Sequence, residues 1–251
     1  MKTLLLLLFT SLLVGLSAQT TRVVYAIKMV PVEKPKLDTA AVKEMDQILG
    51  ENFFGKMLEQ ANRRTFQLEF CAERSHEFIE SPLTDADDLS DGIADILVGT
   101  SREYFYDLST NRRVEQRMEQ NGASCLGVVL SPDSMQWQIR NDTTTTILGR
   151  PCFLATTTYY RTVRGEPRAG IIRAWFTMTL PVPFGPRRYG GLPGLILQVS
   201  VKNITYTAVS IEPATERSCA DLSVPDRRCT ELTEAENRER QQAMRHRRRR
   251  N

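Results

Sequence analysis

The sequence is poor in the residues and motifs that mark recognisable catalysis. Its 251 residues include only two histidines, His76 and His246, which lie far apart in the chain. No two cysteines are spaced as Cys-x-x-Cys and no Gly-x-Ser-x-Gly elbow occurs. These absences argue against a zinc site and against a serine hydrolase. We therefore predict no catalytic residue, no metal ligand and no cofactor.

Long apolar runs are also scarce, and the longest covers Leu4–Leu13, behind the positive Lys2 and ahead of the small-residue exit at Ser17-Ala18. This pattern predicts a secretory signal peptide over residues 1–18, cleaved after Ala18. No cysteine lies near the cut, which excludes a lipoprotein, and no later run is long enough to span a bilayer. We expect a soluble exported protein in the periplasm, at the outer-membrane periphery, or secreted.

Cysteines are few and odd in number: Cys71, Cys125, Cys152, Cys219 and Cys229. Pairing is the default in an exported protein, and an odd count leaves one cysteine over. Cys219 and Cys229 flank a short loop, so we predict this pair first. Cys71 with Cys125 is a weaker second pairing.

The remaining chain has the length of one domain. We predict a single β-rich domain over residues 19–232, with a helical insertion at 38–62, followed by a charged helix and arginine tail at 233–251. Thr233 and Glu236 form a capping-box pattern at the start of that last helix. The net charge is +3, and the positive charge is concentrated in the tail.

Alternation of apolar and polar residues dominates the domain. It predicts strands at Arg22–Met29, Thr65–Cys71, Ser75–Glu80, Arg102–Asp107, Arg112–Glu119, Cys125–Leu130, Met135–Arg140, Cys152–Arg161, Gly170–Met178, Leu195–Val201 and Ile204–Ile211. Helical spacing is confined to the early segments and to a short stretch ending at Gly99. The fold class is therefore α+β and mainly antiparallel β. We expect one curved sheet or open half-barrel with helices packed on it, plus a C-terminal helix.

A stretch rich in proline and glycine, residues 181–197, separates two of the predicted strands. Leu192–Leu195 has proline and glycine where a type II turn requires them, which predicts a positive φ at Gly194. We expect a stiff corner that routes the chain between two neighbouring strands. A ligand loop that uses Arg187 and Arg188 is the weaker alternative.

The segment from Trp137 to Val201 resembles the GLPGLI family. The resemblance rests on Trp137, on Ala174-Trp175-Phe176-Thr177, and on a signature made of Gly185, Pro186, Tyr189, Gly190, Gly191, Leu192, Pro193, Gly194, Leu195 and Ile196. It implies an exported protein of Bacteroides-group bacteria and brings no established activity and no catalytic residue. Both tryptophans lie on alternating strands, where a core or lid position is the usual outcome.

Three functions stay open. The first is a non-catalytic binding or scaffolding module of the cell envelope, whose partner is an unknown envelope protein or a hydrophobic ligand. The second is a carrier of a lipid or other hydrophobic ligand in a half-barrel. The third is a cysteine–histidine hydrolase, which would need His76 beside Cys125 or Cys152, with Asp107 or Asp142 to orient it.

The arginine tail suggests one more partner. Arg245, Arg247, Arg248, Arg249 and Arg250 could contact an anionic membrane surface. A solvated helix end is the common alternative for such a charge run. Nucleic acid is not expected, because no aromatic platform accompanies the tail.

Overall fold

The computed structural model describes residues 19–30, 53–80, 89–118, 125–130, 135–163, 166–224 and 229–248. The signal-peptide prediction and the first part of the predicted helical insertion lie outside these residues. In the described part, no helix is long and apolar enough to cross a membrane.

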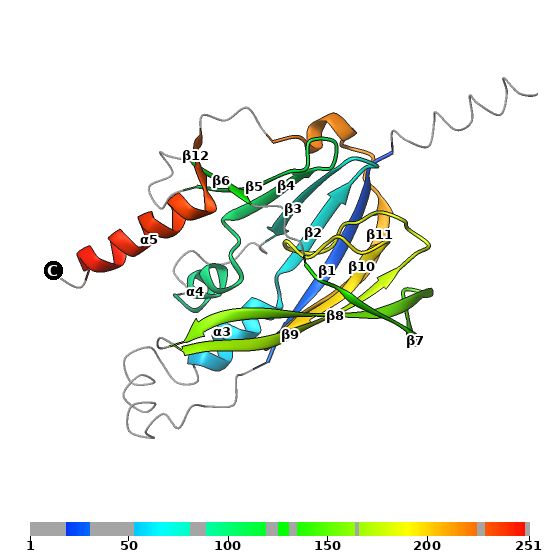
Figure 1. The fold of residues 1–251 in the computed structure, drawn as a ribbon, viewed down its shortest axis with the longest axis horizontal. Helices are drawn as coiled ribbons and strands as arrows, with labels where there is room; N and C mark the ends of the chain where they lie inside the picture. The colour runs from blue at the N-terminus through cyan, green and yellow to red at the C-terminus, as the bar shows by residue number, and fades with distance from the viewer. Residues whose placement is uncertain are drawn as a thin grey trace, which may run out of the picture.

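One twelve-stranded sheet forms the body of the molecule (Figure 1). Its spatial order is β12-β6-β5-β4-β3-β2-β1-β11-β10-β9-β8-β7, and every neighbouring pair is antiparallel except β12 with β6. The sheet is open, with β12 and β7 at its two edges. The strands are β1 (Thr21–Met29), β2 (Thr65–Phe70), β3 (Arg74–Glu80), β4 (Arg102–Asp107), β5 (Arg112–Met118), β6 (Cys125–Leu130), β7 (Gln138–Ile147), β8 (Arg150–Val163), β9 (Glu166–Thr177), β10 (Leu195–Val201), β11 (Ile204–Pro213) and β12 (Cys229–Thr233).

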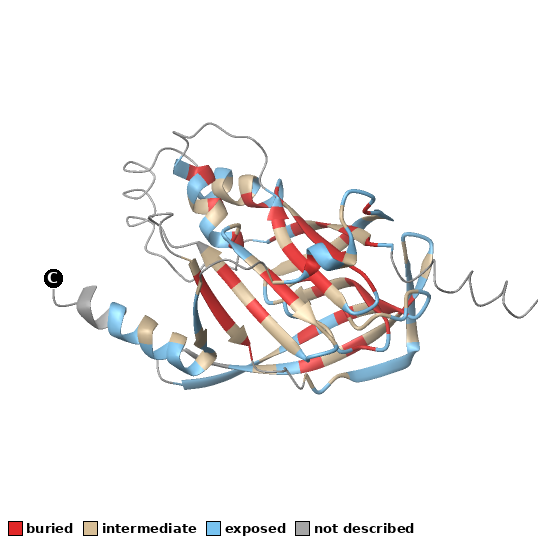
Figure 2. Ribbon diagram, turned by 90° about the horizontal axis from the view of Figure 1, so that it is seen from above, coloured by how far each residue is buried: buried red, intermediate tan, exposed pale blue. Residues whose placement is uncertain are grey.

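One face of the sheet carries the hydrophobic core. Helices α3 (Phe53–Asn62) and α4 (Leu89–Val98), together with the segment between β9 and β10, pack on this face. Their buried side chains join those of the strands in one cluster, which includes Tyr25 and Phe66. Figure 2 marks buried positions in red on the strands and on the helices. Alternate strand residues point to the opposite face. That second face is where charged and polar groups can gather.

Helix α5 (Glu234–Arg248) follows β12 at the edge of the sheet (Figure 1). Its N-terminus confirms the predicted capping box. The Glu236 carboxylate accepts from the backbone N–H of Thr233 at 2.7 Å, and the Glu236 N–H donates to the Thr233 hydroxyl at 3.3 Å. These reciprocal bonds satisfy backbone groups that a helix end leaves without a partner.

The coarse expectation of a mainly antiparallel open sheet is confirmed, and so is the placement of β9 beside β10. Two strands differ from expectation. Strand β7 runs to Ile147, well past the predicted end at Arg140, and β12 was not predicted. β12 is short and mostly polar, so its pairing with β6 comes from tertiary context rather than from its own pattern.

The predicted Cys219–Cys229 disulfide is wrong, as is the Cys71–Cys125 alternative. Cys71 pairs with Cys219, and Cys125 pairs with Cys229. Strand register explains the second bond, because Cys229 lies directly opposite Cys125 on the adjacent strand. Cys152 is the unpaired cysteine and is buried in the core. Both bonds attach the chain that follows β11 to the sheet.

The predicted positive φ at Gly194 is also wrong. Gly191 has the left-handed conformation, with φ of 81°. Gly194 is needed for a different reason: a Cβ there would lie 2.1 Å from the carbonyl oxygen of Thr177. The glycine lets the start of β10 pass close to the end of β9, where any side chain would collide with backbone.

Candidate functional site

A cluster of charged side chains lies on the second face of the sheet, centred on His76. Strand pairing places Arg22 of β1 opposite Glu69 of β2, and Glu69 opposite His76 of β3. Their apolar neighbours Leu68 and Phe70 point into the core. The alternation that fills the core therefore aligns three polar residues in a row on the other face.

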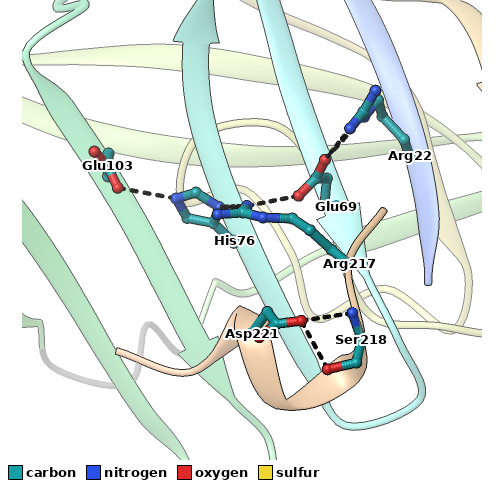
Figure 3. Close-up of polar contacts among 7 residues, drawn as sticks. All are labelled: Arg22, Glu69, His76, Glu103, Arg217, Ser218 and Asp221. Carbon is teal, nitrogen blue, oxygen red and sulfur yellow. Dashed lines mark hydrogen bonds and ion pairs between the residues drawn. The ribbon is translucent and has the colours of Figure 1, made fainter. Parts of the chain in front are cut away.

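Glu69 is the buried centre of this row. Its side chain is 1% exposed and accepts hydrogen bonds from Nε of Arg22 at 2.8 Å and from Nη1 of Arg217 at 2.8 Å (Figure 3). Burial acts to raise the pKa of the Glu69 carboxyl, but the hydrogen bonds from Arg217 and Arg22 outweigh it and lower that pKa below its usual value. Glu69 is thus a fixed carboxylate between two guanidinium groups.

His76 is held through both ring nitrogens. Its Nδ1 lies 2.8 Å from Nη1 of Arg217, and its Nε2 lies 3.1 Å from Oε2 of Glu103 (Figure 3). A guanidinium can only donate, so Nδ1 accepts and the proton lies on Nε2, which donates to Glu103. The ring also stacks on Phe105, with centroids 4.4 Å apart. This pattern assigns a neutral imidazole in a fixed orientation.

Arg217 reaches the cluster from the chain that follows β11. This chain begins with a bond from the Ala214 N–H to the Thr20 carbonyl at 2.7 Å. Ser218 then bonds to Asp221 around a short 3-10 helix (Figure 3). Cys219 forms a disulfide with Cys71, which directly follows β2. We call residues 214–222 the strap. The strap fixes Arg217 over the sheet, and its buried ends, Ala214 and Leu222, lie on either side of Arg217 in the sequence.

A pocket of about 530 Å³ opens beside this cluster. Its lining is mainly charged or aromatic: Arg22, Glu69, His76, Phe78, Ile79, Thr100, Glu103, Glu216 and Arg217. Two arginines and three glutamates give the lining both signs of charge. The guanidinium side chains of Arg22 and Arg217 are 31% and 38% exposed, so each keeps an edge toward the pocket.

Sequence reasoning singled out His76 but missed its partners. Glu69 could have been found, since it occupies an outward position on a predicted strand that pairs with the strand of His76. Glu103 has the same kind of signal on the next strand. Arg217 offered none, because it lies outside any periodic segment and reaches His76 across 141 residues of sequence.

The hydrolase constellation does not assemble. Cys125 is in a disulfide, and Cys152 is buried on β8, six strands from His76, or roughly 29 Å along the sheet. Asp107 binds Ser109 and Arg74, and these bonds lower its pKa to about 2. Asp142 lies on β7, an edge strand that is separated from the strand of His76 by six other strands.

The signature residues lie in the segment between β9 and β10 and in the first two residues of β10, and they serve packing. Leu192, Leu195 and Ile196 are buried in the core cluster. A Cβ at Gly185 would lie 2.5 Å from the Tyr189 carbonyl oxygen, and one at Gly190 would lie 2.7 Å from that of Pro183. Pro186, Gly191, Pro193 and Gly194 complete the set. These contacts describe a tightly routed corner.

Both tryptophans of the family resemblance are half-buried. Nε1 of Trp137 donates to the Gly190 carbonyl at 2.9 Å, which ties the chain before β7 to the signature segment. Trp175 lies on β9 and packs against the edge of the core cluster. The expectation of core or lid positions fits both side chains.

Arg187 of the signature segment also points inward. Its Nε donates to the Tyr206 hydroxyl at 3.0 Å, and its Nη2 donates to the Val98 carbonyl at the end of α4. Burial raises the pKa of the nearby Glu77 carboxyl well above its usual value, against the opposing charges of Arg113 and Arg187. Arg187 therefore anchors the corner to α4 and leaves little of itself for a ligand.

The arginine tail is described only in part. Arg245, Arg247 and Arg248 belong to α5, and Arg249 and Arg250 lie outside the described residues.

Comparison with known proteins gives a family match and a fold match. A family described as a protein of unknown function (Porph_ging) matches residues 138–198, from β7 to β10. This match overlaps the segment that resembles the GLPGLI family, and the assignment to that family stays a prediction. No curated protein matches the chain.

Two structures of PNGF-II, in space groups C2 and P21, have similar folds. The TM-scores are 0.54 and 0.52, at 15% and 14% sequence identity. Each alignment covers 88% of this chain, but only 32% and 33% of the PNGF-II chain. The chain thus spans about a third of that protein, and at this identity the likeness concerns the fold alone.

Proposed function

We propose that the protein is an exported, non-catalytic binding module that holds its ligand at the His76 pocket. The observation that carries the proposal is the continuous chain of contacts along one wall of that pocket, from Arg22 through Glu69, Arg217 and His76 to Glu103. Polar binding sites usually contain charged groups that are held in fixed positions and converge on a cavity.

The network favours binding over catalysis. A general base needs an unoccupied lone pair that is directed toward the substrate. The lone pair on Nδ1 of His76 already accepts from Arg217, and a guanidinium does not give up its proton. Cys219 of the strap cannot act as a nucleophile, because it is bonded to Cys71.

The charges in the lining suggest a dipolar ligand. Arg22 and Arg217 present donor edges, whereas Glu103 and Glu216 present carboxylates in the same pocket. A small molecule or a protein loop that carries both an anionic and a cationic group would meet a partner for each. A purely anionic ligand would face three glutamates.

The lipid-carrier alternative gains no support from the core. The apolar face that a carrier would leave open is occupied by side chains of α3, α4 and the signature segment, among them Ala61, Val98, Phe184 and Leu192. Export is supported by the two disulfides, which persist in oxidising compartments. The contact of the tail with an anionic membrane stays a separate proposal.

The test is an NMR titration with zwitterionic amino acids, followed through the imidazole signals of the two histidines. Saturable shifts of His76, with His246 unchanged, are expected. The variant Arg217→Gln should weaken the interaction about tenfold, as expected for a lost charged hydrogen bond. Arg74→Gln is the matched control, since Arg74 pairs with Asp107 outside the pocket.

Folding is checked through the urea midpoint of each variant. If Arg217→Gln fails to fold, Glu103→Gln replaces it. Absence of saturable shifts at His76 with every amino acid tested, or equal weakening by Arg74→Gln, would contradict the proposal.

A further inference from the structure

A second, larger cleft lies at the other end of the sheet. It has a volume of about 810 Å³ and is formed by β7, β8, β9 and residues near them. Its lining is Met135, Gln136, Gln138, Arg140, Leu154, Thr156, Thr157, Thr158, Tyr159, Tyr160, Ile171, Ile172, Arg173 and Arg188. The volume is within the range of small-molecule sites, roughly 300–1,000 Å³.

The charge of this cleft is of one sign. Among the described residues that line it, three are arginines and none is acidic, a histidine or a cysteine. The whole chain, by comparison, carries 33 basic and 30 acidic residues. Thr156, Thr158 and Tyr160, which alternate with the buried Thr157, add hydroxyl groups that can donate to an anion. The His76 pocket has no such bias.

The arginines project from a rigid part of the sheet. Ala155 and Ala174 are fully buried in the core, so Leu154, Thr156 and Arg173 face outward by strand alternation. Arg140 lies opposite Leu154, and Arg173 lies opposite Thr156. Two strand spacings and two residues along the strand separate Arg140 from Arg173, so their Cα atoms lie roughly 12 Å apart.

Two of the three arginines, Arg140 and Arg173, carry the argument for uncompensated charge. Within the described part of the chain, neither Arg140 nor Arg173 takes part in an ion pair. Arg188 lies 3.5 Å from a carboxylate oxygen of Glu234, and its side chain is still 45% exposed. Two arginines of the cleft therefore have no ion pair in the described structure, and the third shares a surface ion pair, which is weak. We expect the positive charge of such a cleft to attract anions.

We propose that this cleft binds a ligand with two or more anionic groups, such as phosphates, sulfates or carboxylates. The separation of Arg140 and Arg173 leaves room for a separate anionic group at each guanidinium, which favours a ligand with several such groups. The threonine hydroxyls between them can contact oxygens of the same ligand. This site is independent of the His76 pocket and does not depend on the function proposed for it.

The test is calorimetric titration of the full chain with inositol hexakisphosphate, and separately with inorganic phosphate. The multivalent probe should bind at least tenfold more tightly, and its affinity should fall as sodium chloride is raised. Arg140→Gln and Arg173→Gln should each weaken it threefold to tenfold. Arg168→Gln is the matched control, because Arg168 is an exposed arginine of β9 outside the lining.

The control decides between a site and general electrostatics. If Arg168→Gln weakens binding as much as Arg173→Gln, or if phosphate binds as tightly as the multivalent probe, the proposal fails. A variant with Arg245, Arg247, Arg248, Arg249 and Arg250 changed to Gln shows whether the tail holds the probe instead. Full loss of binding in that variant would also overturn the proposal.

Vesicles distinguish a lipid headgroup from a soluble ligand. Sedimentation with vesicles containing anionic lipid is measured for wild type, Arg173→Gln and the tail variant. Retention that depends on Arg173 assigns the anionic groups to a membrane. Retention that depends only on the tail, together with probe binding that depends on Arg173, assigns a soluble ligand to the cleft.

Discussion

Two glycines of the signature segment are needed for different physical reasons: Gly194 for the close approach of backbone, and Gly191 for its positive φ. Gly194 stands where the segment enters β10, and a Cβ there would lie 2.1 Å from the Thr177 carbonyl oxygen and 2.7 Å from its carbonyl carbon. Both atoms belong to the backbone of β9, so no side-chain rotation relieves the collision. Gly191 has the opposite situation, with φ of 81° and nothing within 4 Å of its Cβ position.

The magnitudes follow from these geometries. Gly194→Ala must displace one strand end relative to the other, and overpacking of this kind costs about 3 kcal/mol or more. Gly191→Ala costs about 1 kcal/mol, because the strain of a left-handed residue is partly offset by a less flexible unfolded chain. Gly191→Asn should cost less than Gly191→Ala, since asparagine tolerates this conformation.

Urea unfolding of the three variants, with both disulfides intact, measures the order of their midpoints. Gly194→Ala should have the lowest midpoint, then Gly191→Ala, then Gly191→Asn. A Gly191→Ala midpoint at or below that of Gly194→Ala would refute the argument, because it would make backbone conformation more demanding than the close approach of β9 and β10.

Three further outcomes follow from buried groups. Arg64 is fully buried and bonds to two aspartates of α4 at 2.5 and 3.0 Å, so Arg64→Met should lower the free energy of unfolding by about 3 kcal/mol, and a change below 1 kcal/mol would contradict this. Folding lowers the pKa of the Glu69 carboxyl, so the ionised carboxylate stabilises the fold at neutral pH, and this stabilisation is lost as the pH falls through the folded-state pKa. The difference in urea midpoint between wild type and Glu69→Gln should therefore shrink from pH 7 to pH 3. Thiol titration of the unreduced, unfolded chain should give one thiol, and peptide mapping should place it at Cys152.

The sheet could be predicted to a large extent from local pattern. Strand β1 alternates cleanly, with Val23, Tyr25, Ile27 and Met29 buried on one face. The turns that follow Asp107 and Val201 were also predicted, and they contain the positive-φ residues Asn111 and Lys202. Gly194 was found for the wrong reason. A proline–glycine pair indicates a turn, but the approach of a second strand is invisible until the strands are paired.

Strand β12, the two disulfides and the position of Arg217 in the site depend on information that no local pattern carries. β12 has only five residues and pairs in parallel with β6, to which it is joined by a disulfide. The strap brings Arg217 to Glu69 across 148 residues of sequence. Spacing along the chain favoured the neighbours Cys219 and Cys229, whereas the fold holds them at separate places. Long-range pairing of this kind follows from packing and not from periodicity.

The cleft and the His76 pocket are built from different parts of the chain. Arg140, Arg173 and Arg188 all lie within residues 138–198, the segment matched by the family of unknown function. The His76 pocket needs β1 to β4 and the strap, all outside that segment. The pocket therefore depends on the strap and on the Cys71–Cys219 bond, which position Arg217 outside the matched segment, whereas the three arginines of the cleft lie inside it.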